Sequence, residues 1–156
     1  MKSILYAEDR EDDVFFLRRA CRRAGFDGVM QIHSVNDGQM AVDYLTGAGV
    51  YADRTRFPRP DLVLLDLKMP RRSGLEVLEW IRAQPEMTEL PVFLLTSSNQ
   101  QADIERASAL GANGYFIKPG GIGELATMVD ELANAVGVRP PHAALMAAAA
   151  AASISG

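Results

Sequence analysis

The sequence has a single cysteine, Cys21, and only two histidines. One cysteine excludes an internal disulfide and a zinc site built from cysteines, and it is typical of proteins from a reducing compartment. We therefore expect a cytoplasmic protein. Cys21 continues the apolar stripe of a predicted helix, so we expect it to lie in the core.

The chain also lacks a long hydrophobic run and an excess of basic charge. Its longest apolar run, Ala143–Ala152, is too short to span a bilayer. The chain passes from Met1 and Lys2 through a short apolar run into acidic residues, so we expect no signal peptide. The net charge of −4 provides no basic field for nucleic acid. We therefore expect neither a membrane nor a nucleic acid as a partner.

The composition is typical of one folded domain, with 48% hydrophobic and 23% charged residues. The length of 156 residues fits one domain and is too short for two of ordinary size. We predict a single domain over residues 1–136. The remaining residues, 137–156, form an alanine-rich tail that we interpret as either disordered or an interaction element.

Short apolar runs alternate with helical patterns along the domain. We predict strands at 3–7, 29–34, 62–65, 92–95 and 115–117, and helices at 13–24, 37–45, 101–110, 122–136 and after a cap at Ser73. Such alternation predicts an α/β fold, a doubly wound parallel sheet with helices on both faces. The long connection 46–60 breaks the pattern, and loops of that length tend to carry function or disorder.

Polar residues follow the predicted strands at their carboxyl ends. Glu8 and Asp9 follow the first strand, Asp66 the third, Thr96 ends the fourth, and Lys118 follows the fifth. In open parallel sheets ligands bind beyond these strand ends, so we expect the five side chains to meet at one rim. The carboxylates among them are the oxygen ligands that Mg²⁺ prefers.

The acids that come next in the sequence have a simpler interpretation. Glu11, Asp12 and Asp13 open a predicted helix, where negative charge stabilises the helix dipole. We therefore expect these three to be ordinary acids of a helix N-terminus, without a part in the site.

Asp66 follows a run of apolar residues, and a carboxylate buried there is unfavourable unless a positive charge meets it. A metal ion and Lys118 would meet that need. A carboxylate so placed can also attack phosphorus and form an acyl phosphate, while the metal and the lysine neutralise the phosphoryl group. Thr96 could hydrogen-bond a phosphate oxygen, whereas chemistry alone makes Tyr115 only a core ring.

These stretches together resemble the receiver domain of two-component response regulators. The resemblance covers residues 2 to about 136 and is carried by four stretches: Glu8-Asp9, Leu-Leu-Asp-Leu-Lys-Met-Pro around Asp66, Leu-Leu-Thr-Ser-Ser at Thr96, and Gly-Ala-Asn-Gly-Tyr-Phe-Ile-Lys-Pro ending at Pro119. It implies a flavodoxin-like (βα)5 fold with a five-stranded parallel sheet in the order 2-1-3-4-5.

The resemblance also implies a role for each rim residue. Asp66 would be the phosphoacceptor, phosphorylated by a sensor histidine kinase. Thr96 and Lys118 would contact the phosphoryl group, and Tyr115 would swing inward with Thr96 on activation. The implied Mg²⁺ ligands are Glu8, Asp9, Asp66 and the backbone carbonyl of Lys68.

The connection 46–60 and the Leu-Thr-Ser-Ser-Asn form of the fourth loop resemble one subgroup, the single-domain regulators paired with bacterial phytochromes and related sensor kinases. Members of this subgroup often form dimers. The expected partners are therefore a histidine kinase of the bacteriophytochrome type, a downstream protein and a second copy of the chain. An exposed Phe15 on the first helix would suit docking of a kinase helix.

Two other functions stay open as alternatives. A phosphatase of the haloacid dehalogenase type also uses a strand-end aspartate and Mg²⁺, but that family calls for a second aspartate where this chain has Lys68. A receiver-shaped scaffold that works without phosphate is disfavoured by the intact site. The tail leaves no room for a helix-turn-helix domain. We expect no enzymatic activity beyond assistance of its own phosphotransfer and autodephosphorylation.

Overall fold

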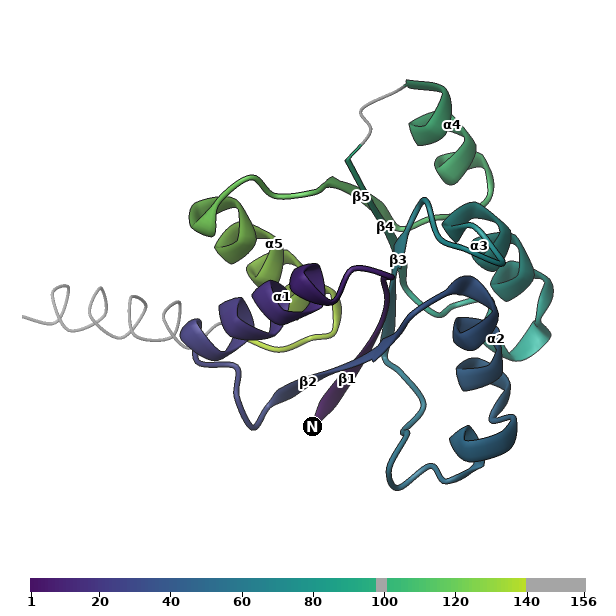
Figure 1. The fold of residues 1–156 in the computed structure, drawn as a ribbon, viewed down its shortest axis with the longest axis horizontal. Helices are drawn as coiled ribbons and strands as arrows, with labels where there is room; N and C mark the ends of the chain where they lie inside the picture. Colours follow the sequence, from purple (N-terminus) through teal and green to yellow (C-terminus); the bar gives the residue numbers. More distant parts are fainter. Residues whose placement is uncertain (98–100, 140–156) are drawn as a thin grey trace, which may run out of the picture.

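The computed structural model describes residues 1–97 and 101–139. A five-stranded sheet in the order β2-β1-β3-β4-β5 lies between two layers of helices (Figure 1). Its strands, all paired in parallel, are β1 (Lys2–Ala7), β2 (Met30–Val35), β3 (Leu62–Asp66), β4 (Val92–Thr96) and β5 (Gly114–Ile117). The predicted doubly wound parallel sheet and its strand order are confirmed.

Helices cover both faces of this sheet (Figure 1). One face carries α1 (Glu11–Arg23) and α5 (Ile122–Ala135); the other carries α2 (Gly38–Thr46), α3 (Gly74–Ala83) and α4 (Gln101–Ala109). A hydrophobic cluster fills the space between each helical layer and the sheet. Cys21 lies in the first of these clusters, as the sequence predicts.

The central strand β3 is buried along its whole length. Leu62 and Leu64 pack toward α1 and α5, while Val63 and Leu65 pack toward α2 and α3, because successive side chains of a strand point to opposite faces. Both faces are apolar, which explains why the strand reads as an uninterrupted hydrophobic run. Asp66 is thus held at the end of a rigid, fully buried element.

The helix ends follow the local signals of the sequence. The Oγ of Ser73 accepts a hydrogen bond from the amide of Glu76 at 3.2 Å, which caps α3. Helix α2 ends at Gly47, whose positive φ of 76° is the left-handed conformation that glycine adopts without strain. Strand β2 begins and ends one residue later than predicted.

The long connection 46–60 is ordered by its own contacts. It contains a short 3-10 helix, η1 (Gly49–Ala52). The rings of Tyr51 and Phe57 pack against Tyr44 of α2, with centroids 5.1 and 6.0 Å away. The guanidinium of Arg54 donates to the carbonyl oxygens of Tyr44 at 2.8 Å and Phe57 at 3.2 Å. The segment therefore packs onto α2 through aromatic and hydrogen-bonding contacts.

Two further expectations concern the C-terminal tail and membrane-spanning helices. From residue 140 onward the predicted tail lies outside the described residues. Within the described ranges, none of the helices has the length and apolarity that crossing a membrane requires.

Candidate functional site

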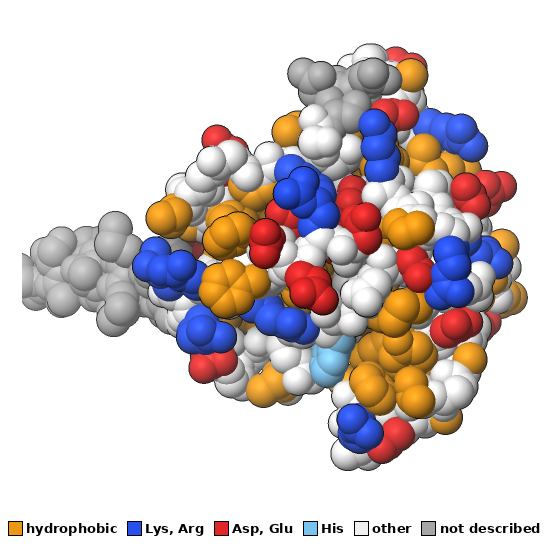
Figure 2. Space-filling model, in the orientation of Figure 1, with side chains coloured by type: hydrophobic (Ala, Val, Ile, Leu, Met, Phe, Trp, Pro, Cys, Tyr) orange, Lys and Arg blue, Asp and Glu red, His pale blue; other side chains and the backbone are white. Residues whose placement is uncertain are grey.

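The carboxyl ends of four neighbouring strands bring the predicted residues together at one rim. Glu8 follows β1, Asp66 and Thr96 end β3 and β4, and Lys118 follows β5. Figure 2 shows acidic and basic side chains gathered over this part of the molecule. In the described ranges the buried polar and charged residues are Ser3, Glu8, Asp66 and Thr96, so most of them belong to this rim.

Three carboxylates at the rim are close enough to share a cation. Glu8, Asp9 and Asp66 each offer an oxygen, and these oxygens lie within 4.8 Å of one another. Glu8 and Asp66 are only 1% and 5% exposed, whereas Asp9 is exposed. Buried carboxylates in such proximity repel each other and lose hydration, so a positive charge between them is favourable. Their oxygen-only ligand set fits a hard divalent cation such as Mg²⁺.

Lys118 supplies positive charge from the opposite side of the rim. Its Nζ lies 2.9 Å from Asp13 Oδ2, 3.0 Å from Glu8 Oε2 and 3.4 Å from Asp66 Oδ2. Burial alone would lower the pKa of Lys118, but the hydrogen bonds with Asp13 and Glu8, together with the charge of Asp66, raise it above its ordinary value. The side chain is therefore held as a cation next to Asp66.

The contact with Asp13 corrects a prediction. We expected Asp13 to be an ordinary acid of a helix N-terminus, and it does lie in the first turn of α1. Its carboxylate nevertheless pairs with Lys118, a residue 105 positions away in the sequence. The expectation was wrong for this residue because stabilisation of the helix dipole depends only on position within the helix, whereas this contact forms between segments that folding brings together.

Glu8 is the most constrained acid of the site. Burial raises the pKa of its carboxyl to about 7, although the hydrogen bond from Lys118 lowers it and the charge of Asp66 raises it again. The hydroxyl of Tyr6 donates to Oε2 at 3.3 Å, and the amide of Arg10 donates to Oε1 at 3.1 Å. Burial, followed by the charge of Glu8, raises the pKa of Tyr6, so this phenol remains a donor. Both oxygens of Glu8 are thereby fixed in direction.

The chain folds back tightly just after Asp66. The amide of Lys68 donates to Asp66 Oδ1 at 3.3 Å, and the amide of Gly74 donates to the Leu67 carbonyl at 3.0 Å. A Cβ at Gly74 would lie 2.4 Å from the backbone oxygen of Asp66, so only glycine permits this approach. The Lys68 side chain is exposed, and the metal-ligand role of its carbonyl stays a prediction.

Thr96 and Tyr115 lie together on the far side of the rim. Thr96 is 1% exposed, and its carbonyl accepts a hydrogen bond from the amide of Lys118 at 2.6 Å. Burial and then the charge of Asp103 raise the pKa of Tyr115, whereas a side-chain hydrogen bond with Thr96 lowers it. The two predicted switch residues are therefore close enough for Thr96 to influence the Tyr115 hydroxyl, and their movement on activation stays a prediction.

Sequence reasoning missed the anchor that holds the loop between β3 and α3. The guanidinium of Arg71 donates from Nε to Asp37 Oδ2 at 2.9 Å and from Nη2 to Oδ1 at 3.1 Å. Asp37 Oδ1 also accepts from the amide of Met40 at 2.8 Å and so caps α2. Arg71 has a positive φ of 66°, unlike the other non-glycine residues described. An aspartate as the first residue of the predicted helix 37–45 could have indicated the cap, but nothing local indicated its partner.

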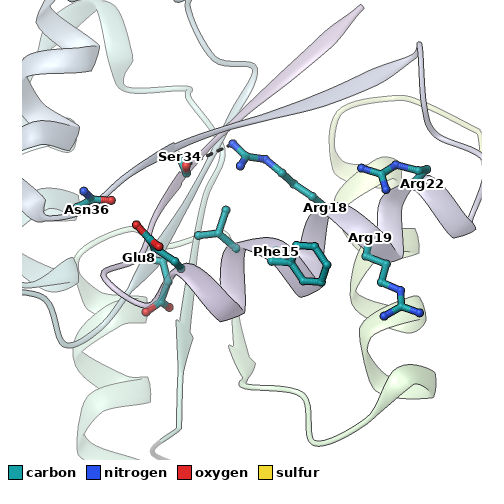
Figure 3. A pocket seen from close by; sticks show the side chains of 9 residues that line it. Glu8, Phe15, Arg18, Arg19, Arg22, Ser34 and Asn36 are labelled. Carbon is teal, nitrogen blue, oxygen red and sulfur yellow. Dashed lines mark hydrogen bonds between the residues drawn. The ribbon is translucent and has the colours of Figure 1, made fainter.

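A cavity of about 320 Å³ opens beside Glu8 along α1 (Figure 3). Phe15 and the stems of Arg18 and Arg22 lie along it, and Phe15 is 58% exposed, as predicted. Arg18 donates to the Ile32 carbonyl at 3.1 Å and to Ser34 Oγ at 3.3 Å, which fixes α1 against β2. The cavity therefore combines an exposed aromatic ring with basic side chains next to the acidic rim.

Comparison of the sequence with known families gives a match over most of the chain. Residues 4–130 match the response regulator receiver domain. Among curated relatives, the probable methanogenesis regulatory protein FilR2 of Methanothrix harundinacea is 36% identical over 83% of this chain and 79% of its own length. Response regulator Rcp1 of Synechocystis is 33% identical over 82% of this chain and 84% of its own length.

Solved structures give the same result. Response regulator RPA3017, from red light signaling of R. palustris, superposes with a TM-score of 0.78 at 32% identity and covers 85% of this chain and 92% of its own. The phosphorylated cyanobacterial phytochrome response regulator RcpA gives a TM-score of 0.74 at 31% identity, covering 85% and 91%. Rcp1 has also been solved in a Mn²⁺-bound form, with a TM-score of 0.72 at 30% identity and coverage of 85% and 92%.

Proposed function

The chain belongs to the response regulator receiver domain family, and on that basis we propose that it is a phosphorylation-controlled interaction module whose phosphoacceptor is Asp66. The observation that carries the proposal is the position of Lys118 Nζ, 3.4 Å from Asp66 Oδ2, beside a trio of carboxylates within 4.8 Å of one another. A nucleophilic carboxylate, a cation site and a fixed ammonium are the parts that phosphoryl transfer to aspartate requires.

In the proposed mechanism, Glu8, Asp9 and Asp66 would hold Mg²⁺, together with the backbone carbonyl of Lys68. Bound there, the ion would supply neutralising charge to the carboxylates and to the incoming phosphoryl group. One oxygen of Asp66 attacks phosphorus as the bond to the donor's histidine nitrogen breaks. Because Asp66 ends a buried strand and accepts a hydrogen bond from the Lys68 amide, its carboxylate is oriented before the donor arrives.

Two side chains already at the rim would stabilise the charge that phosphorylation adds to Asp66. Lys118 is held as an ammonium and pairs with a phosphoryl oxygen, and the Thr96 hydroxyl donates to another. Thr96 influences the pKa of the Tyr115 hydroxyl, so a new partner for Thr96 changes the environment of that ring. We propose that this coupling transmits phosphorylation to the surface formed by β4, β5 and their helices.

The proposed donor is a sensor histidine kinase in the cytoplasm, of the phytochrome-linked type, because Rcp1, RcpA and RPA3017 are similar over most of their length. The exposed Phe15 beside the cavity on α1 supports docking of a kinase helix there. The output is a downstream protein, and a homodimer is the proposed assembly. We retain the proposed division into a receiver domain, 1–136, and a tail, 137–156.

A phosphatase with an aspartate nucleophile is the competing function. It would need a carboxylic acid two residues after Asp66 to protonate the leaving group. That position holds Lys68, whose side chain is exposed and whose amide is used to orient Asp66. A receiver-shaped scaffold without phosphotransfer is not favoured either, because it gives no reason to bury Glu8 and Asp66 together.

The test is incubation of the full chain with Mg²⁺ and acetyl phosphate, followed by intact-mass measurement. We expect the wild type and Asp12→Asn, an exposed-acid control, to gain one phosphoryl group, and Asp66→Asn to gain none. Equal labelling of the wild type and Asp66→Asn, or labelling of neither, would contradict the assignment. Many turnovers of a small phosphate ester would favour the phosphatase.

A further inference from the structure

Lys118 is shared among carboxylates that do not all have the same task. Glu8 and Asp66 belong to the trio that can hold a divalent cation, whereas Asp13 does not. Yet the shortest of the three contacts to Lys118 Nζ is that of Asp13 Oδ2 at 2.9 Å, against 3.0 Å for Glu8 and 3.4 Å for Asp66. The ammonium thus contacts Asp13, which has no place among the expected metal ligands, as closely as it contacts Glu8, which has one.

A cation at the trio and the ammonium of Lys118 compete for the same oxygens. Glu8 Oε2 already accepts from the Tyr6 hydroxyl, and its other oxygen accepts from the Arg10 amide. A divalent cation that binds Glu8 and Asp66 therefore takes partners from Lys118 and also repels its charge. A carboxylate outside the trio would then help to keep the Lys118 side chain at the rim.

We propose that Asp13 is a positioning residue that holds the Lys118 ammonium aside from Glu8 and Asp66, so that a divalent cation binds these carboxylates while Lys118 stays within reach of the phosphoryl group. The inference rests on the proposed function, because it presumes a cation at the trio and phosphotransfer to Asp66. It adds a residue on α1 to a site otherwise built at the strand ends.

The placement of Asp13 suits this task. It comes from the first turn of α1, so it approaches Lys118 from a different element than the strand-end acids. The side chains of Asp13 and Lys118 are 29% and 21% exposed, which leaves the pair partly shielded from water and its attraction stronger than that of a surface pair. Arg10 also approaches Asp13, but at 3.9 Å and with a largely exposed side chain, so it is the weaker partner.

The same geometry lets Asp13 release Lys118 after phosphotransfer. A phosphoryl group on Asp66 carries more negative charge than a carboxylate and offers several acceptor oxygens. Asp66 Oδ2 is already 3.4 Å from Nζ, so a small shift of the lysine side chain exchanges one partner for the other. Asp13 therefore holds Lys118 near Asp66 through an ion pair that is weak enough for a phosphoryl group on Asp66 to replace.

The experiment is calorimetric titration of Mg²⁺ into the full chain. Asp13→Asn removes the counter-ion with little change of shape, and Asp12→Asn removes an equal charge from the exposed neighbour in the same turn. We expect Asp13→Asn to raise the Kd for Mg²⁺ about fivefold, the size of one partly exposed ion pair, and Asp12→Asn to change it less than about twofold. Asp13→Glu, which keeps the charge, is expected to restore binding.

The same substitution in a Lys118→Gln protein distinguishes positioning of Lys118 by Asp13 from direct attraction between Asp13 and the metal. In Lys118→Gln no ammonium competes for the carboxylates, so Asp13→Asn is expected to leave the Kd unchanged there; far-UV circular dichroism checks that each variant is folded. Equal effects of Asp12→Asn and Asp13→Asn, or an undiminished effect in the Lys118→Gln background, would overturn the role of Asp13 while wild-type Mg²⁺ binding still stood. A wild type that binds no Mg²⁺ would overturn both proposals.

Discussion

Gly74, the first residue of α3, lies so close to the phosphoacceptor strand that its replacement by alanine should displace Asp66. An added Cβ would lie 2.4 Å from the Asp66 oxygen, 3.0 Å from the Asp66 carbonyl carbon and 3.1 Å from the Leu67 Cα. These neighbours are backbone atoms and cannot rotate away. Either the end of β3 or the start of α3 must move.

Two opposing contributions set the size of the effect. Overpacking of this kind costs about 1–3 kcal/mol, with the upper end more appropriate because backbone must shift. Alanine recovers up to about 1 kcal/mol by restricting the unfolded chain and favouring helix. We therefore expect Gly74→Ala to lower the free energy of unfolding by about 1–2 kcal/mol and the Tm by roughly 5 °C.

A matched control lies in α5. Gly123 also stands in the first turn of a helix, but apart from its chain neighbours and its own helix backbone no atom lies within 4 Å of an added Cβ. Gly123→Ala should therefore raise stability by about 0.5 kcal/mol. Urea unfolding followed by the fluorescence of Trp80, the single tryptophan, measures both variants. If Gly74→Ala proved as stable as Gly123→Ala, the close approach of α3 to Asp66 would be refuted.

Three other predictions concern stability. Burial, with the charge of Arg18, lowers the pKa of His33, so the unfolded chain binds the proton more tightly and stability should fall as the pH drops below the ordinary value of 6.5. Between pH 7 and about pH 5 the urea midpoint of His33→Gln should therefore fall less than that of the wild type. Parallel curves for the two proteins would contradict this. Asp37→Ala removes the α2 cap and should lower the free energy of unfolding in urea by about 1 kcal/mol. Arg71→Gln leaves the cap in place and should lower it by less. A larger loss for Arg71→Gln than for Asp37→Ala would refute the role of the cap. Arg82 donates to backbone acceptors before β4 and to backbone and side-chain acceptors before β5. Arg82→Lys should therefore lower the free energy of unfolding by about 1–2 kcal/mol, measured by thermal unfolding, and an unchanged Tm would contradict this.

Much of the fold could be predicted because its signals are local. The buried run of β3, the Ser73 cap and the glycine after α2 each occupy a few consecutive residues, and the structure confirms all three. Strand-end acids could be placed at one rim because parallel strands align their carboxyl ends. The long connection 46–60 resisted interpretation, since its order comes from Arg54 and from rings that meet only after folding.

The predicted site was incomplete for the same physical reason. Asp13 reaches Lys118 across 105 positions and Arg71 reaches Asp37 across 34, and no pattern within a helix or loop indicates such pairs. The acids of α1 satisfy the helix dipole equally well whether or not one of them has a partner. Distinguishing Asp13 from Asp12 required the three-dimensional arrangement.

The most direct test of the central claim is the location of the phosphoryl group. The protein would be phosphorylated with acetyl phosphate and Mg²⁺, reduced with sodium borohydride, which acts on acyl phosphates, and mapped by tandem mass spectrometry. We expect modification at Asp66 alone, with Asp9, Asp12 and Asp13 unmodified. Modification at another acid, or an unmodified Asp66 in protein that carries a phosphoryl group, would contradict it.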